Sequence, residues 1–249
     1  MKDIAIWIAA LCCAGVAAAA EPSARLPGIG ADDPRAEVEM TQPPWNAIVK
    51  VQTNLANSCT GALVAADIVL TAAHCLYNPR TRRMLQGGSL HVLFGYQRGD
   101  YASHHAVTRY VAGTDRPNHT VADWALLDLA PGDESNDVVP LRLAETPVGP
   151  GDPVAMAGFS RDRKHVLLAD RACHVTGTGP LVQHNCTGTF GSSGAPLLAR
   201  RGPRWEIVGV TAALASDGAK LAVPASVLRA ALAEFRRQSS TTCHEPSGC

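Results

Sequence analysis

The stretch "CTGTFGSSGAPLL", residues 186–198, places two serines between glycines, just before a short apolar run. Gly191 and Gly194 flank Ser192 and Ser193, so the backbone around the two hydroxyls is nearly free of side chains. Glycine permits tight turns and the close approach of another molecule. The stretch therefore fits either a plain turn before a strand or a nucleophile that needs bare backbone around it.

A serine hydroxyl attacks well only when a base removes its proton, and an imidazole held by a carboxylate is suited to that task near neutral pH. Two other motifs contain such groups. "VLTAAHCLYN" places His74 after an apolar strand, and "VADWALLDL" places Asp123 before another. Taken singly, His74 fits a structural role and Asp123 a turn or cap. Together with the glycine-rich turn they make up the parts of a hydrolytic site.

Short β-prone runs separated by turn residues recur from Trp45 onward, among them "NAIVKVQT", "LHVLFG", "PVAMAGF" and "EIVGVTAA". This pattern predicts an all-β sandwich or barrel, and no helical pattern alternates with the strands as a βαβ sheet would need. One helix is predicted over residues 224–238. Its apolar face consists of Val227, Leu228, Ala231, Leu232 and Phe235.

The ends of the chain differ in composition from the strand-rich middle. Residues 1–20 resemble a signal peptide, with Ala18–Ala20 as a small-residue cleavage site. The polar stretch 130–140 favours a boundary between two halves. The expected segments are a signal peptide at 1–20, a linker or pro-segment at 21–36, two halves at 37–135 and 136–238, and a polar tail at 239–249.

The cysteines and the charge balance indicate an exported, soluble protein. Removal of the signal peptide takes Cys12 and Cys13 and leaves an even number of cysteines, which in an exported chain predicts disulfides. Spacing alone does not choose the pairing, and joining neighbours is the simplest one. It gives Cys59–Cys75, Cys173–Cys186 and Cys243–Cys249.

The chain carries 22 basic and 22 acidic residues, so its charge gives no basis for binding nucleic acid or an anionic membrane. Beyond the signal peptide, no segment approaches the length of apolar sequence that spans a bilayer. We expect a secreted or periplasmic monomer that meets no membrane once the signal peptide is removed.

In their order along the chain, "LTAAHC", "DWALLDL" and "GSSGAP" resemble the three motifs of the trypsin/chymotrypsin-like serine peptidases. The similarity covers roughly residues 37–235 and is greatest to the bacterial branch that includes glutamyl endopeptidases. The resemblance implies two six-stranded antiparallel β-barrels, one in each half, with the active site between them and a C-terminal helix.

The resemblance also implies a role for each motif residue. His74 is the general base and then acid, Asp123 orients it, and Ser193 is the nucleophile; the backbone N–H groups of Gly191 and Ser193 form the oxyanion hole. The implied activity is hydrolysis of protein or peptide substrates through an acyl-enzyme, with no cofactor and no metal.

Ser192 stands where the trypsin branch has an aspartate that pairs with a newly cut N-terminal ammonium. A serine cannot form that ion pair. Our hypothesis is that the oxyanion turn of this chain forms without such an activation switch.

The strand at 207–218 corresponds to the one that lines the primary specificity pocket in the family. The expected pocket residues are Gly188, Thr211, Ala212 and Ala213. They are small and uncharged, and Thr211 replaces the histidine that reads glutamate in glutamyl endopeptidases. The expectation is therefore a small or apolar substrate side chain. Ala212 also stands where a serine often supports the catalytic aspartate.

Three other interpretations compete with this one. An α/β-hydrolase would need the pattern G-x-S-x-G, which Ala195 breaks, and a catalytic histidine after the serine, where only His244 remains. A zinc site would use ligands such as Cys75, Cys173 and His184, whose spacing does not fit the usual patterns. The third interpretation is a catalytically weak or inactive peptidase-like binding protein, because a fold does not by itself imply an activity.

Overall fold

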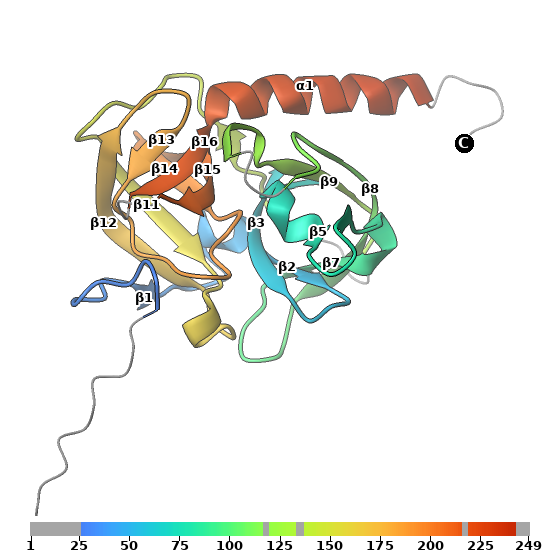
Figure 1. Ribbon diagram of the computed structural model, residues 1–249, viewed down its shortest axis with the longest axis horizontal. Coiled ribbons are helices and arrows are strands. Elements are labelled where there is room, and N and C mark those ends of the chain that lie inside the picture. Colours follow the sequence, from blue (N-terminus) through green and yellow to red (C-terminus); the bar gives the residue numbers. More distant parts are fainter. Residues whose placement is uncertain (1–25, 117–119, 133–136, 216–218, 243–249) are drawn as a thin grey trace, which may run out of the picture.

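The structure is a computed structural model that describes residues 26–116, 120–132, 137–215 and 219–242. Two β-barrels lie side by side, and one long helix crosses the top of the molecule (Figure 1). The predicted signal peptide and the predicted Cys243–Cys249 pair lie outside the described residues.

The first barrel is a closed ring of six antiparallel strands in the order β2-β3-β4-β9-β8-β7. The strands are β2 (Ile48–Thr53), β3 (Ser58–Ala65), β4 (Ile68–Thr71), β7 (Leu90–Phe94), β8 (Ser103–Ala112) and β9 (Ala125–Leu129). Large apolar side chains such as Ile48, Leu63, Leu70 and Leu126 are almost fully buried, as a small closed barrel requires.

The second barrel follows the order β12-β11-β14-β15-β16-β13, and pairing of β12 with β13 closes the ring. Its strands are β11 (Pro153–Gly158), β12 (Leu168–Gly177), β13 (Val182–His184), β14 (Pro196–Arg201), β15 (Arg204–Leu214) and β16 (Lys220–Pro224). Short β10 (Arg142–Leu143) joins β15 in parallel. Two six-stranded antiparallel barrels confirm the fold expected from the sequence.

The remaining short elements lie in the connections. β5 (Tyr77–Asn78) and β6 (Arg83–Met84) form a hairpin, and 3-10 turns occupy Trp45–Ala47, Ala73–Leu76, Gly87–Ser89, Thr120–Ala122 and Arg161–Arg163.

The segment before the first barrel packs on the second barrel. β1 (Ala36–Glu37) pairs with β12, and Arg35 is buried between Asp33 and Asp162, with ion-pair distances of 2.8 and 2.7 Å. Residues 21–36 were expected to form a linker or pro-segment. The described part of this segment, residues 26–36, lies against the second barrel, and the chain enters the first barrel at β2.

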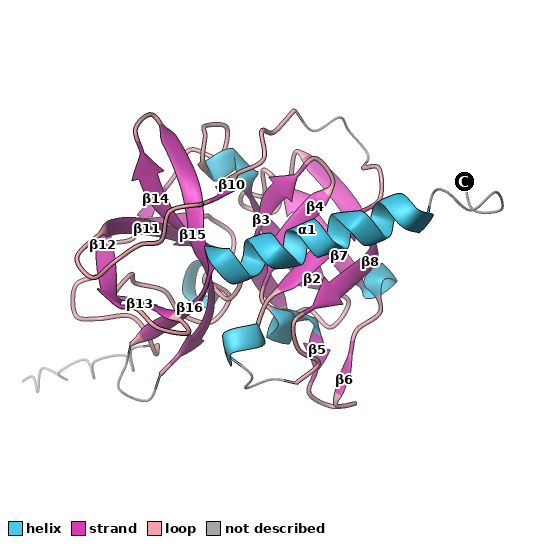
Figure 2. Ribbon diagram, turned by 90° about the horizontal axis from the view of Figure 1, so that it is seen from above, coloured by secondary structure: helices cyan, strands magenta, loops and turns pink. Residues whose placement is uncertain are grey.

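The C-terminal helix α1 (Ala225–Thr242) begins where the sequence predicts and connects the two barrels (Figure 2). Leu228 and Phe235 are buried, and the guanidinium of Arg109 on β8 lies 4.2 Å from the centre of the Phe235 ring. Val227 was expected on the apolar face but is 38% exposed, so the buried stripe of the helix is narrower than the sequence indicated. No helix in the described part of the chain is long and apolar enough to cross a membrane.

Two disulfides tie neighbouring segments together. One joins Cys59 on β3 to Cys75, and the other joins Cys173 on β12 to Cys186. These are two of the three pairs obtained by joining neighbours along the sequence.

His184 on β13 is buried to 1% exposure, and neither ring nitrogen has a hydrogen-bond partner among the described residues. Burial, and then the charge of Lys220, lowers the pKa of His184 to about 3. The ring is therefore neutral inside the barrel, where protonation would place an uncompensated charge.

We predict that this histidine makes the fold sensitive to acid. Between pH 6.5 and 3 the unfolded chain binds a proton at His184 that the folded chain excludes, so the free energy of unfolding falls as pH falls. The contribution is on the order of 4 kcal/mol. Urea unfolding across this range should show a weaker pH dependence for His184→Leu than for the wild type. The exposed His174 on β12 gives the control His174→Leu, which should keep the wild-type slope. Equal slopes for wild type and His184→Leu would contradict the prediction.

Candidate active site

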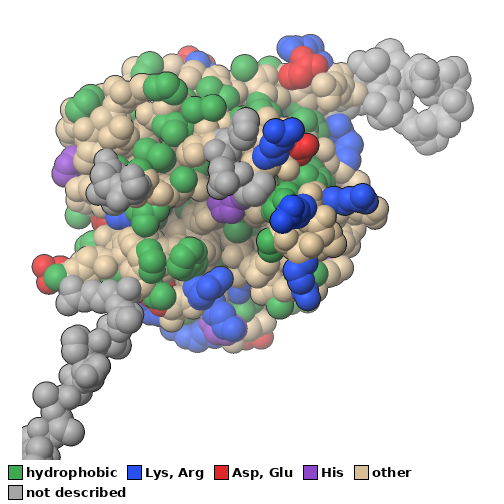
Figure 3. All heavy atoms as spheres, in the orientation of Figure 1, with side chains coloured by type: hydrophobic (Ala, Val, Ile, Leu, Met, Phe, Trp, Pro, Cys, Tyr) green, Lys and Arg blue, Asp and Glu red, His purple; other side chains and the backbone are tan. Residues whose placement is uncertain are grey.

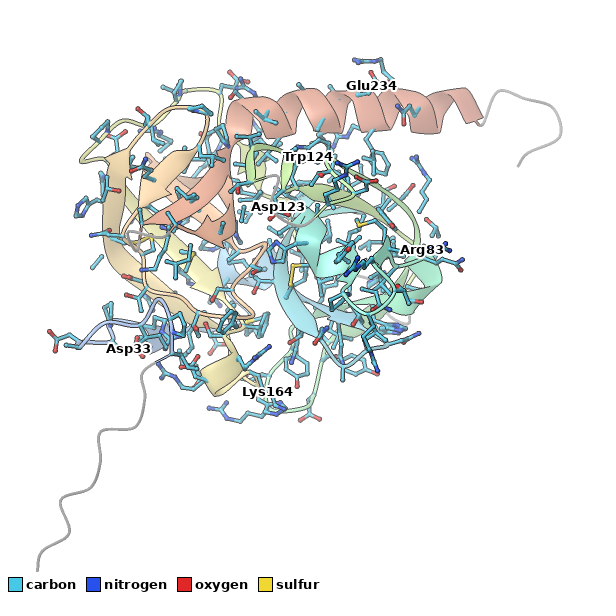
Figure 4. The ribbon with its side chains drawn as sticks, in the orientation of Figure 1. Asp33, Arg83, Asp123, Trp124, Lys164 and Glu234 are labelled. Carbon is cyan, nitrogen blue, oxygen red and sulfur yellow. A yellow bond between two sulfur atoms is a disulfide. The ribbon has the colours of Figure 1, made fainter. Side chains whose placement is uncertain are left out.

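His74 and Asp123 meet because they flank two paired strands. His74 lies in the 3-10 turn just after β4, and Asp123 lies just before β9. Since Thr71 at the end of β4 pairs with Ala125 at the start of β9, both residues are at the same end of the first barrel. Figure 4 shows Asp123 pointing into the region between the barrels.

Both oxygens of the Asp123 carboxylate bind the same histidine. Oδ2 lies 2.7 Å from the His74 ring nitrogen Nδ1, and Oδ1 accepts the His74 backbone N–H at 2.9 Å. Asp123 is 5% exposed, and these bonds offset the cost of burying its charge. A proton on Nδ1 completes the bond to the carboxylate and leaves Nε2 as the proton acceptor.

Ser193 reaches the same place from the second barrel, in the turn before β14. Its carbonyl oxygen accepts the backbone N–H of Thr60 on β3 at 2.9 Å, which ties the serine to the first barrel. Sγ of Cys75 lies 3.9 Å both from Nε2 of His74 and from the carbonyl oxygen of Ser193. His74 and Ser193 also line two adjoining cavities together. The structure thus brings the three candidate residues to the contact between the barrels.

The turn that contains Ser193 is held by close contacts on both sides of the serine that only glycine allows. Gly191 has φ +94°, and a Cβ there would lie 2.3 Å from the carbonyl oxygen of Phe159. Gly194 has φ +79°, and its Cβ would lie 2.2 Å from the carbonyl oxygen of Thr60. The Thr60 hydroxyl donates to the carbonyl of Gly191 and accepts the N–H of Phe159, both at 2.9 Å.

The peptide between Phe190 and Gly191 has a defined direction. The Phe190 carbonyl oxygen accepts the backbone N–H of Arg161 at 2.6 Å. Because a trans peptide is planar, the N–H of Gly191 points to the opposite side, away from Arg161. Gly191 and Ser193 line the same groove, so this orientation suits a pair of N–H donors for an oxyanion.

Ser192 occupies the interior below this turn. Its Oγ lies 2.7 Å from Oγ of Ser160, and the two residues are 4% and 1% exposed. Ser192 occupies the position of the aspartate found in the trypsin branch. Its neutral hydroxyl pairs with another hydroxyl, whereas an aspartate there would need a cationic partner.

The first cavity beside Ser193 encloses about 340 Å³ within the second barrel. The four pocket residues expected from the sequence, Gly188, Thr211, Ala212 and Ala213, all line it. Sequence reasoning missed Pro27, Met156 and Lys220, which line it as well. Lys220 is the first residue of β16, and the pairing of this strand with β15 brings it to the pocket.

A second groove of about 520 Å³ lies on the other side of His74 and Ser193. Residues of both barrels line it, including Tyr77 from the first and Arg161 and Lys164 from the second. On the face shown in Figure 3, basic side chains gather over the lower and right-hand parts, beside a central hollow.

The cysteines considered for a zinc site are engaged elsewhere. The sulfur atoms of Cys59 and Cys75 lie near the His74 ring, with ligand atoms within 4.8 Å of one another, but the two sulfurs are bonded to each other. Cys173 and Cys186 are bonded in the same way. None of these four offers the thiolate that zinc binds.

The sequence is similar to those of two known proteases. A vitellin-degrading protease of Bombyx mori is 43% identical over 72 residues, which are 27% of this chain and 26% of that protein. Serine protease 23 of Bos taurus is 28% identical over 198 residues, which are 67% of this chain and 51% of that protein. The chain thus spans about a quarter and about half of the lengths of these relatives.

A solved structure of a Glu endopeptidase in complex with MPD superposes with a TM-score of 0.69 and 23% identity, over 86% of this chain and 99% of that one. At this identity the likeness concerns the fold. The sequence also matches the family described as Trypsin over residues 34–231, which include both barrels and the beginning of the helix. This chain therefore belongs to the trypsin family.

Proposed function

We propose that the chain is a serine endopeptidase that hydrolyses peptide bonds with Ser193, His74 and Asp123. The observation that carries the proposal is the buried Asp123 carboxylate, whose two oxygens both bind His74 at the edge of the groove that Ser193 lines. A carboxylate in a purely structural turn has no need to fix an imidazole beside a serine.

In the proposed reaction, Oγ of Ser193 attacks the carbonyl carbon of the substrate while Nε2 of His74 takes the hydroxyl proton. The negative oxygen that forms receives the N–H groups of Gly191 and Ser193. The carbon–nitrogen bond then breaks as His74 passes its proton to the leaving amine. A water molecule then attacks the acyl carbon of the acyl-enzyme by the same steps. The carboxylic acid product leaves and the hydroxyl of Ser193 is restored. Asp123 stays ionised and stabilises the imidazolium.

We also propose that the protein is exported and acts in the periplasm or outside the cell on protein or peptide substrates. The signal-like start of the sequence supports this, as do the two disulfides, since such bonds persist in oxidising compartments. The rival reading is a binding protein on the same fold. Ala212 favours the binding protein, because alanine lacks the hydroxyl that a serine at this position would offer to Asp123.

A fluorophosphonate probe separates the peptidase from the binding protein. We predict stoichiometric labelling of the wild type and none of Ser193→Ala. The control Ser192→Ala should still be labelled, because that hydroxyl is bonded to Ser160. On a cleaved peptide, Ser193→Ala or His74→Ala should lower kcat roughly 10⁴- to 10⁶-fold. Asp123→Asn should lower it about 10⁴-fold through the wrong imidazole tautomer. Folded wild type that resists the probe would favour the binding protein.

The oxyanion turn gives a second prediction. Gly191→Ala should lower kcat on the order of 10²- to 10³-fold, because the new Cβ meets the Phe159 carbonyl and turns the donor away. Gly151 has a similar φ of +89° with open space around it, so Gly151→Ala carries the same backbone strain without the clash. Steady-state kinetics should leave this control close to wild type. Equal losses in the two variants would mean that the turn has no special role.

A third prediction concerns activation. Because Ser192 pairs with the neutral Ser160, no new N-terminal ammonium is needed to form the turn. Forms of the protein that begin at different residues between 21 and 26 should cleave the same peptide at similar rates. All-or-none dependence on one particular N-terminus would contradict this.

A further inference from the structure

The cavity beside Ser193 contains a lysine. Lys220 is the first residue of β16 and pairs across the sheet with Leu214 on one side and His184 on the other. Leu214 belongs to β15, the strand that forms one wall of the cavity, and Lys220 lines the same cavity. The position of Lys220 at the start of its strand thus places a cation in the candidate specificity pocket.

No carboxylate among the described residues forms an ion pair with Lys220. Asp170 attracts its charge from a distance, but that carboxylate is buried and accepts the backbone N–H groups of Ala172 and Thr187 at 3.1 and 2.8 Å. Burial is the main cause of a lowered pKa for the Lys220 amine. His184, the neighbour on β13, is neutral. The pocket therefore holds a partly desolvated ammonium that has no ion-pair partner among the described residues.

The N-terminal segment closes the pocket around this side chain. The Gly28 carbonyl accepts the N–H of Gly188 at 3.4 Å, and Pro27 lines the cavity. A Cβ on Gly28 would lie 2.1 Å from the carbonyl oxygen of Gly188 and 3.6 Å from Cε of Lys220. This packing covers part of the lysine stem, whose exposure is intermediate, and a partly desolvated charge attracts an opposite charge more strongly than one in bulk water.

The other described residues that line the pocket, His74 apart, are uncharged, so they do not compete with Lys220 for a charged group of the substrate. Apart from His74 at the rim, Lys220 is the only titratable side chain among the described residues that line the pocket. The remaining walls are glycine, alanine, serine, threonine and apolar side chains.

We propose that Lys220 determines specificity and that the pocket takes an acidic side chain, so that the enzyme cleaves after glutamate or aspartate. This rests on the proposed peptidase function. A carboxylate entering the pocket gains a charge-assisted hydrogen bond and supplies the ion-pair partner that no described residue gives Lys220. A small or apolar side chain, which the sequence alone favoured, would give the ammonium no such bond.

General attraction of acidic substrates is the main competing explanation. Arg161 and Lys164 line the groove on the other side of Ser193, where they too would favour negative charge. The two explanations differ in position along the substrate. Lys220 acts on the residue just before the scissile bond, whereas groove cations act on other residues.

The test uses one peptide sequence with Glu, Asp, Gln, Leu or Lys before the scissile bond. For wild type we expect kcat/KM to be roughly 100-fold higher for Glu or Asp than for Gln, the scale of a desolvated charge pair. Lys220→Met keeps the length of the stem without the charge and should remove this ratio. Lys220→Arg should keep the preference for acidic residues, and Lys220→Glu should shift it towards Lys. Lys164→Met should leave the Glu-to-Gln ratio as in wild type.

Fluorophosphonate labelling of each preparation identifies which proposal fails. A labelled wild type that shows no acidic preference overturns the role of Lys220 and leaves the peptidase proposal standing. The same holds if the preference survives in labelled Lys220→Met or is lost in Lys164→Met. Folded wild type that is neither labelled nor active overturns both proposals.

Discussion

The two hydrogen bonds between the Asp123 carboxylate and His74 are the constraint on which the rest of the site depends. A buried carboxylate is tolerated only when its charge is met by donors, and here both donors come from one residue. The pairing of β4 with β9 supplies this geometry, because it brings the turn that carries His74 to the start of the strand that follows Asp123. The core of the first barrel therefore sets the direction of the imidazole.

Thr60 extends that order into the second barrel. It lies on β3, yet its hydroxyl and backbone N–H bind three groups of the second barrel: the carbonyls of Gly191 and Ser193 and the N–H of Phe159. The turn that presents Ser193 is thus shaped partly by a strand of the opposite barrel. Helix α1 adds a second connection through Phe235 and Arg109. Relative movement of the barrels would disturb the turn and the imidazole together.

The candidate specificity pocket depends on a segment that is distant in sequence. Residues 26–38 precede the first barrel but pack on the second, held by the β1 pairing and by the buried Arg35. Gly28 then lies against Gly188 and beside the stem of Lys220. In the proposed enzyme the reaction takes place between the barrels. The substrate side chain is bound within the second barrel, in the pocket that this segment helps to form.

Local patterns in the sequence were enough to predict the strands, the helix and the candidate triad. The alternating apolar runs indicated strands, the amphipathic stretch after residue 224 indicated the helix, and the three motifs indicated the family and the candidate triad. Such patterns can be recognised without knowledge of the fold. A glycine-rich turn or a strand with one buried face leaves its pattern in a few neighbouring residues.

The contacts between groups that are distant in sequence could be found only in the folded chain. The Ser160–Ser192 pair, the place of residues 26–38 on the second barrel and the entry of Lys220 into the pocket all depend on which strands pair and in which register. The exposure of Val227 likewise depends on how closely α1 approaches the barrels. Register and packing come from contacts between residues far apart in the chain, and no short stretch of sequence contains them.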